Sequence, residues 1–247
     1  MVGSSGGDGV AARDGGDPVT GVVAALQAEL GPLGDGLRRQ SSPLGTPIYE
    51  TQLERGGRIV AVVAGVGKVA AASAAAALIA EGATRLLVVG TCGGLRAEER
   101  VGDLIHASRA VQWDLAVRGG RELTADPELL EAWGVVAEGE QGCILTADRP
   151  VIRFLDRLRV ARAAGRAYPG PLAADMEVAA VGAVASQAGI PWAALKVVSD
   201  QRPGWLGALR GARSGLEGFE EALATHGARP AASVGQLCEE LERLARP

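Results

Sequence analysis

The sequence predicts a single α/β domain, and two observations support this fold class. Short apolar runs that are typical of strands are followed along the chain by small-residue stretches with helical spacing. Of the 247 residues, 47% are apolar but only 3% are aromatic, which favours tightly packed helices and strands over an all-β sandwich. A chain of this length suits one core. We expect this domain to span residues 18–247, preceded by a disordered tail of Gly, Asp and Ser over residues 1–17.

The composition excludes several classes of partner. The net charge of −4 provides no electrostatic footprint for nucleic acid or for an anionic membrane. No segment is long and apolar enough to span a bilayer, and the tail has no apolar run that would make it a signal peptide or an anchor. The cysteines Cys92, Cys143 and Cys238 are far apart, without metal-ligand spacing. We therefore expect a reduced, cytoplasmic protein without a metal.

The first third of the chain begins with an apolar strand over residues 18–26. Glu29 follows it and fits a favourable acid in the first turn of a helix. Residues 32–54 are broken by Gly and Pro and predict a loop and an edge hairpin, before a strand over 58–64 and a helix over 69–81. The glycine turn between them, residues 65–68, lacks the further Gly and Ser/Thr of a phosphate-binding loop, so we interpret it as close packing of helix on strand.

The middle of the chain places small residues at a strand end. A strand over residues 85–90 opens into Thr91, Cys92, Gly93 and Gly94, where the backbone can approach a ligand closely and expose its N–H groups. Another strand leads from residues 101–103 toward Trp113 and Asp114. A helix with Asp126 as N-cap and Pro127 at its first position ends near Gly134, and a strand over 141–147 follows.

Residues 173–200 carry the most specific pattern. A helix from Val178 has apolar residues at helical spacing and ends at Gly189, and an apolar strand over 192–198 then runs into Ser199 and Asp200. Ligands of open α/β sheets lie beyond the carboxyl ends of strands, so Asp200 is where a ligand would be met. Asp175 and Glu177 stand at the helix start, where favourable electrostatics with the helix N-terminus alone explains them equally well.

The C-terminal region begins with a predicted mobile loop over residues 201–213. Two helices follow, each with a capping box: Ser214 pairs with Glu217, and Ser233 with Gln236. The last helix should pack on the body through one apolar face, formed by Val234, Leu237, Cys238, Leu241 and Leu244.

The string from Asp175 to Asp200 closely resembles the signature of the nucleoside phosphorylase and nucleosidase superfamily, in particular the methylthioadenosine/S-adenosylhomocysteine nucleosidases. The glycine turns at residues 65–70 and 90–94 are similar to turns of the same family, and the resemblance covers about residues 18–200. It implies a single domain with a central mixed sheet flanked by helices. It also implies a homo-oligomer, with a dimer favoured, that acts in purine nucleoside catabolism and methionine salvage.

The resemblance implies that the substrate is a purine nucleoside of the adenosine type, whose N-glycosidic bond is cleaved. In the family a Ser-Asp pair handles the base, so Asp200, protonated, would donate to N7, with Ser199 beside it. Such an acid must keep its proton near neutrality through burial. Glu29 would orient the attacking water, with Thr91 and Lys196 nearby, and this division of roles parallels inverting glycosidases.

The remaining positions of the site carry over in the same way. Glu177 would hold the ribose hydroxyls and Met176 would pack against the sugar. The other residues that the resemblance assigns to substrate binding are Asp175, Cys92, Gly93, Val151 and Pro150. Pro150 stands where the nucleosidases have a Phe that stacks on the purine, which is a departure from the family pattern. Trp113 and Asp114 fall in the region of subunit contacts.

Three functions stay open at this point. Hydrolysis is favoured because the arginines with which related phosphorylases hold phosphate are replaced by Val88 and by residues 24–29. Phosphorolysis, with phosphate as co-substrate and no other cofactor, is the alternative; Pro150 and the long C-terminal region point to hopanoid-associated adenosylhopane phosphorylases. A non-catalytic nucleoside-binding domain would be expected to lose the acids that are present here. The histidines His106 and His226 lie beside no nucleophile motif.

Overall fold

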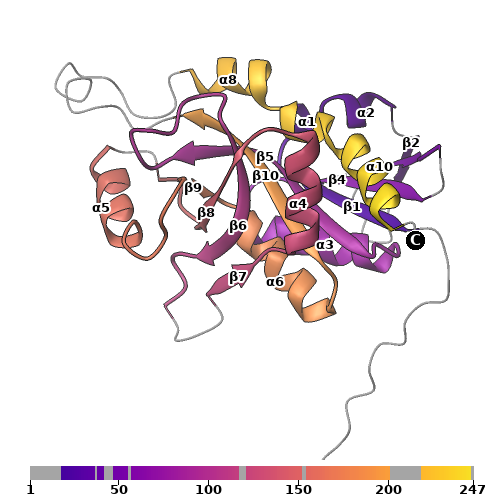
Figure 1. Ribbon diagram of the computed structural model, residues 1–247, viewed down its shortest axis with the longest axis horizontal. Helices are drawn as coiled ribbons and strands as arrows, with labels where there is room; N and C mark the ends of the chain where they lie inside the picture. The colour runs from indigo at the N-terminus through magenta and orange to yellow at the C-terminus, as the bar shows by residue number, and fades with distance from the viewer. Residues whose placement is uncertain are drawn as a thin grey trace, which may run out of the picture.

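The computed structural model describes residues 18–36, 38–41, 47–54, 57–116, 121–151, 154–200 and 218–245. Residues 1–17, the expected loop over 201–213 and the expected capping box of Ser214 and Glu217 lie outside these ranges. Within them, the chain forms one mixed β-sheet flanked by helices (Figure 1). The predicted α/β class with a central mixed sheet is therefore confirmed.

The centre of the sheet is parallel. Its strands lie in the order β4-β1-β5-β10, and they are β1 (Val19–Ala24), β4 (Arg58–Val63), β5 (Arg85–Gly94) and β10 (Trp192–Asp200). All four are apolar runs that are buried over most of their length, as expected of parallel strands covered on both faces. Because parallel strands end at the same edge of a sheet, the carboxyl ends of β1, β5 and β10 meet there.

The sheet curls back on itself beyond β10. There β10 pairs antiparallel with β6 (Leu104–Gln112), β6 pairs parallel with β8 (Glu140–Thr146), and β8 pairs parallel with β9 (Leu172–Asp175). The strand β9 then returns to the end of β5, so that β5, β10, β6, β8 and β9 form a closed ring. Consequently the ends of β5, β9 and β10 are brought around one space.

The strand β5 is longer than expected. Residues 91–94 continue it instead of forming a loop, because Thr91 pairs with Val197 of β10 and Gly93 with Ala174 of β9. The sheet edges carry β7 (Glu122–Thr124), which pairs with β6, and a hairpin of β2 (Arg38–Ser41) and β3 (Pro47–Gln52) that confirms the predicted edge hairpin. The elements that the sequence did not predict are α2 (Pro32–Gly36), β7, α5 (Phe154–Ala164), β9 and α9 (Arg229–Ala232).

The helices α3 (Lys68–Ala80) and α6 (Val178–Ala188) pack against each other. A Cβ at Gly182 would lie 2.9 Å from the Trp192 indole, so α6 reaches the sheet only because this residue is glycine. Gly189, with φ 68°, ends α6 as predicted. In α4 (Pro127–Val136), Asp126 caps the helix by accepting from the Leu129 N–H at 2.9 Å, but the helix continues past the expected end.

The C-terminal helices α8 (Phe219–His226), α9 and α10 (Val234–Leu244) return to the body, and α10 lies against α4 (Figure 1). The expected capping box of Ser233 and Gln236 is wrong. The Ser233 hydroxyl accepts from the Trp133 indole N–H at 2.7 Å and donates to the Pro230 carbonyl at 2.8 Å, so it makes no cap. Of the expected packing face, Leu244 is 53% exposed, whereas Val234, Leu237 and Cys238 are buried.

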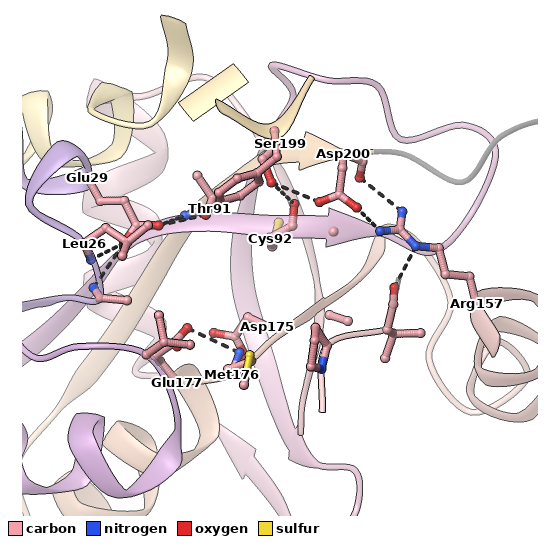
Figure 2. A pocket seen from close by; sticks show the side chains of 17 residues that line it. Leu26, Glu29, Thr91, Cys92, Arg157, Asp175, Met176, Glu177, Ser199 and Asp200 are labelled. Carbon is pink, nitrogen blue, oxygen red and sulfur yellow. Dashed lines mark hydrogen bonds and ion pairs between the residues drawn. The ribbon is translucent and has the colours of Figure 1, made fainter. Parts of the chain in front are cut away.

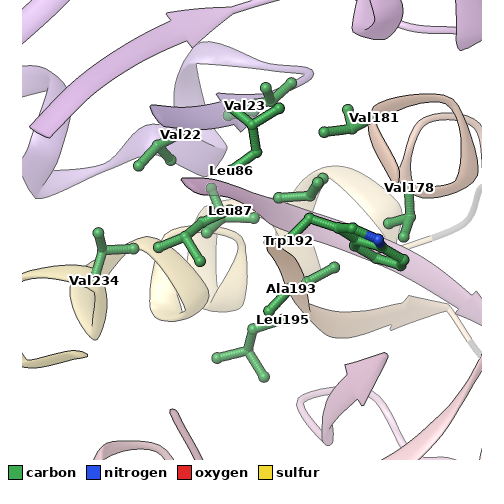
Figure 3. Close-up of a cluster of buried hydrophobic side chains, with 14 of the residues drawn as sticks. Val22, Val23, Leu86, Leu87, Val178, Val181, Trp192, Ala193, Leu195 and Val234 are labelled. Carbon is green, nitrogen blue, oxygen red and sulfur yellow. The ribbon is translucent and has the colours of Figure 1, made fainter. Parts of the chain in front are cut away.

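The main core gathers around the parallel strands. Figure 3 shows side chains of β1, β5 and β10 between those of α6 and those of α10, namely Val22, Val23, Leu86, Leu87, Trp192, Val178, Val181 and Val234. This packing makes the strand ends a rigid platform for the polar groups that follow them.

Candidate active site

A cavity of about 230 Å³ opens at the carboxyl ends of β1, β5, β9 and β10. This volume suits a small ligand, since pockets for drug-sized molecules are typically about 300–1,000 Å³. Most of the residues that the sequence singled out line it: Glu29, Thr91, Cys92, Gly93, Pro150, Val151, Asp175, Met176, Glu177, Ser199 and Asp200. Figure 2 shows Glu29 and Glu177 on one side of the cavity and Asp200 on the other.

Glu29 is held by the turn after β1. It is 2% exposed and belongs to the short helix α1 (Gln27–Leu30). One carboxylate oxygen accepts from the N–H groups of Ala25 and Leu26 at 3.0 and 2.9 Å, and the other accepts from the N–H and the hydroxyl of Thr91 at 2.7 and 2.8 Å. Glu29 is thus an acid in the first turn of α1, as expected from the sequence, and it also lines the cavity.

Gly90 makes the contact between Glu29 and β5 possible. Its φ is +138°, and a Cβ there would lie 2.7 Å from the Glu29 carboxyl carbon. Only glycine tolerates both the backbone conformation and this approach. Gly90 therefore allows the Glu29 carboxylate to pack directly against the backbone of β5.

A carboxylate pair at the end of β9 surrounds a buried lysine. The Lys196 ammonium lies 3.3 Å from Asp175 and 3.7 Å from Glu177, and it is 1% exposed. Burial alone would lower the pKa of Lys196, but the two carboxylates raise it, so the ammonium stays charged. Lys196 does not line the cavity; it lies behind the carboxylates and supports them.

Asp175 and Glu177 differ in what they face. Asp175 accepts from the Thr146 hydroxyl at 2.6 Å and from the Val178 N–H at 2.9 Å, so its carboxylate binds a free N–H group at the start of α6. Glu177 accepts from the Gly67 N–H at 3.0 Å, which brings the glycine turn of residues 65–68 into the site. Burial raises the pKa of Glu177, with Lys196 opposing and Asp175 reinforcing that shift. Next to Glu177, Met176 presents its thioether to the cavity (Figure 2).

Asp200 ends β10, and its side chain is 14% exposed. The Ser199 hydroxyl lies 3.1 Å from Asp200 Oδ1 and 3.2 Å from the Cys92 carbonyl. Cys92 itself donates its thiol to the Val197 carbonyl, and burial raises the pKa of that thiol, so it is no nucleophile. The adjacent Gly93 is close-packed, since a Cβ there would lie 3.2 Å from both the Asp200 carboxylate and the guanidinium of Arg157.

Arg157 is the site residue that sequence reasoning missed. It projects from α5, is 2% exposed, and forms an ion pair with the Asp200 carboxylate (Figure 2). Its Nε donates to the Val151 carbonyl at 2.7 Å and its Nη1 to the Gly94 carbonyl at 3.2 Å. Among the described lining residues, Arg157 is the one cationic side chain. No sequence signal distinguished it, because α5 carries several arginines whose burial cannot be read from their spacing.

The rest of the lining is mostly apolar and includes Pro150, Val151, Val66 and Phe219 of α8. Asp114, expected at a subunit contact, accepts from Lys68 at 2.6 Å and from the Asp148 N–H at 2.7 Å within this chain.

Within the described ranges, no three His, Cys, Asp or Glu side chains are grouped so as to hold a metal ion. The cysteines Cys92, Cys143 and Cys238 are free and buried. None of the helices in the described segments has the length and apolar character needed to cross a membrane.

A small cavity with carboxylates at the ends of β1, β9 and β10 is typical of an α/β enzyme that handles a small polar molecule with acids. A family model described as the phosphorylase superfamily matches residues 16–237. The chain belongs to this superfamily, and it is an enzyme, either an N-glycosidase or a pentosyltransferase.

Solved structures share the fold at low sequence identity. An S-adenosylhomocysteine nucleosidase from Streptococcus pyogenes, in complex with 5-methylthiotubericidin, has a TM-score of 0.77 and 23% identity, with 92% of this chain and 99% of that chain covered. A 5'-methylthioadenosine/S-adenosylhomocysteine nucleosidase from Helicobacter pylori has a TM-score of 0.78 and 20% identity, with 91% and 99% covered. A futalosine hydrolase mutant from the same species has a TM-score of 0.74 and 19% identity, with 92% and 99% covered.

Proposed function

We propose that this protein cleaves the N-glycosidic bond of an adenosine-type purine nucleoside by hydrolysis. The observation that carries the proposal is the arrangement of acids across one cavity. Asp200 lies on one side, and Glu29 and Glu177 lie on the other. Bond cleavage needs an acid at the leaving base and a carboxylate at the incoming water, on opposite faces of the sugar.

The contacts of Ser199 are compatible with a protonated Asp200. A hydroxyl has one proton, and that of Ser199 lies within hydrogen-bond distance of both the Cys92 carbonyl and Asp200 Oδ1. The Ser199 hydroxyl can donate to either oxygen, and a proton on Oδ1 would let Asp200 donate to the Ser199 oxygen while Ser199 donates to the Cys92 carbonyl. A purine N7 that approaches Oδ1 can take this proton in place of Ser199, which then donates to the Asp200 carboxylate.

The opposite wall would receive the water. All four strong acceptor positions of Glu29 are occupied, two by main-chain N–H groups of the β1 turn and two by Thr91. Thr91 is the one of these donors that can turn, because its hydroxyl rotates. A water bound at the Thr91 oxygen would pass a proton through this hydroxyl to Glu29. Glu177 and Met176, beside them, would hold the ribose.

The proposed reaction balances without a cofactor. The proton of Asp200 goes to N7, and the bond between N9 and C1′ breaks with its electron pair on the base. The water oxygen bonds to C1′, and the proton that this water loses reaches Glu29 through Thr91. Transfer of that proton to solvent and uptake of another by Asp200 restore the enzyme, with free base and free pentose as products.

The acidic side chains opposite Asp200 favour water over phosphate as the acceptor. Glu29 and Glu177 are both buried carboxylates at the cavity, and a phosphate anion placed between them would be repelled. The positions where related phosphorylases carry arginine hold Val88, which lies in the core, and residues 24–29. Arg157 cannot serve instead, because it is engaged at the Asp200 side.

The decisive experiment measures release of free base by chromatography from methylthioadenosine, S-adenosylhomocysteine, adenosine and inosine, with and without phosphate. The wild type is expected to release adenine in phosphate-free buffer, and D200N to lose about 10²–10⁴-fold in rate. The matched control is E131Q, an exposed acid of α4, which should retain full activity.

The outcomes separate the candidate functions. Release that requires phosphate and yields a pentose 1-phosphate would identify a phosphorylase. Binding without release would indicate a nucleoside-binding domain. If no free base is released from any of the four nucleosides, bulkier nucleosides such as adenosylhopane become the candidate substrates. We further propose a cytoplasmic homodimer active in methionine salvage, for which light scattering of the purified protein provides the test of assembly.

A further inference from the structure

Arg157 joins the three walls at the Asp200 side of the cavity. It contacts the Val151 carbonyl after β8, the Gly94 carbonyl at the end of β5, and Asp200 at the end of β10. Four of its five N–H groups are directed at these partners when the weaker contact to the Asp200 carbonyl, at 3.5 Å, is included. These contacts hold the planar guanidinium of Arg157 in one orientation, and the ion pair then fixes the carboxyl group of Asp200.

The charge of Arg157 is balanced at one place. Its main-chain partners are neutral carbonyls, and within the described residues its one carboxylate partner is Asp200. Burial lowers the pKa of Arg157 to about 10, which still leaves the guanidinium protonated near neutrality. Because a buried charge is costly without a partner, Arg157 favours the ionised form of Asp200 and has no carboxylate counterion while that carboxyl group is protonated, so it promotes release of the proton.

This arrangement matters at the moment of proton transfer. When Asp200 gives its proton to the base, it becomes a carboxylate, and the negative charge develops next to a guanidinium that is already in place. Donors that are oriented in advance toward developing charge stabilise a transition state without further reorganisation. A neutral side chain at position 157 would leave that carboxylate buried without a cation.

We propose that Arg157 is the positioning residue of Asp200: it fixes the carboxyl group at the base and stabilises the carboxylate that remains after proton transfer. The inference rests on the proposed function, in which Asp200 is the acid. It differs from a purely structural role, in which Arg157 would only tie the β8–α5 connection to the sheet. The two roles separate because a positioning residue acts through Asp200 and a structural clamp does not.

The test is a double-mutant cycle on base release from the nucleoside that the wild type accepts. R157M should lower kcat by about 10²-fold with a smaller change in KM, since a displaced catalytic group costs on this order. In the D200N background the same substitution should cost almost nothing. R157K, which keeps the charge but loses the fork of donors, should lie between R157M and the wild type. R159M, on the exposed face of the same helix, is the matched control and should behave like the wild type.

A second substrate gives an independent measure. The nitrophenolate leaving group of 4-nitrophenyl β-D-ribofuranoside needs no proton from Asp200. R157M should therefore cleave this substrate at nearly the wild-type rate, although it cleaves the nucleoside slowly. Equal losses on both substrates, or an equal loss in the wild-type and D200N backgrounds, would show a structural clamp and overturn the inference, although the proposed function would stand. Absence of base release by the wild type itself would overturn the proposed function and this inference with it.

Discussion

At the scale of single residues, the contact between Thr91 and Glu29 determines how water can be activated. The Thr91 hydroxyl is the one donor to Glu29 that is not fixed in the main chain. Its N–H group holds the same carboxylate oxygen independently at 2.7 Å. Removal of the hydroxyl should therefore leave Glu29 in place and interrupt only the path from water to the carboxylate.

We therefore predict that T91V lowers kcat by about tenfold, the approximate equivalent of one hydrogen bond, and leaves the melting temperature almost unchanged. T91S keeps the hydroxyl and should retain activity. Steady-state kinetics and thermal denaturation of the two variants provide the check. Full activity in T91V would mean that water reaches Glu29 by another route.

The same scale shows which site residues a sequence can reveal. Asp200 and Thr91 were predictable because each follows an apolar run that is recognisable as a buried strand, and the strand end then places it. Arg157 was not, because its helix carries two further arginines, Arg159 and Arg162, and both are exposed. Only the folded chain shows that this one arginine turns inward.

At the scale of elements, the carboxylates after β9 and the lysine of β10 form a buried cluster whose stability depends on pH. Burial raises the pKa of Glu177, although Lys196 opposes the shift. The folded state therefore binds this proton more tightly than the unfolded state does. The contribution of Glu177 to stability is present below the ordinary pKa of Glu and is lost as the pH rises through the raised value.

Because the pKa of Glu177 is raised, we predict that the stability of the wild type relative to E177Q falls as the pH rises above the ordinary pKa of Glu, by at most about 1.4 kcal/mol per pH unit. Urea denaturation of both proteins across this range measures the difference. E131Q, an exposed change on α4, should show no such trend. A difference that grows with pH would mean that Lys196 outweighs burial.

One buried hydrogen bond contributes to the attachment of the C-terminal helices. Because the Ser233 hydroxyl accepts from the Trp133 indole N–H, S233A would leave that donor buried without a partner. We predict a loss of about 1–3 kcal/mol in the free energy of unfolding for S233A, and none for Q236A, which a capping box would have made equally important. Chemical denaturation tests both, and W133F combined with S233A should cost less than the sum of the single changes.

Elements were predictable where their pattern is local. The helix α4, with its Asp-Pro start, and the buried strands carry their signals within a few residues. The strand character of residues 91–94 does not, since their glycines favour a loop and only pairing with β9 and β10 makes them a strand. The strand β9 is four residues long and was likewise hidden from local analysis.

At the scale of the whole molecule, the cavity is assembled from segments that are far apart in the sequence, from Ala25 to Phe219. The closed ring of β5, β10, β6, β8 and β9 brings these segments together, so the cavity exists only when the ring is complete. Any molecule that binds there contacts several strands at once. Binding must therefore stabilise the fold as one unit and not a single part of it.

We accordingly predict that adenine, the proposed product, raises the midpoint of a single thermal transition as its concentration increases. At 100 times its dissociation constant, the stabilisation should be about 2.7 kcal/mol, because it binds the folded chain alone. D200N should respond to higher concentrations only, since it lacks the carboxyl group at the base, whereas R159M should respond like the wild type. Calorimetric scans over a range of adenine concentrations measure these shifts. Two separate transitions, only one of which moves, would contradict a cavity that depends on the whole ring, and equal shifts in D200N and the wild type would contradict the place of the base beside Asp200.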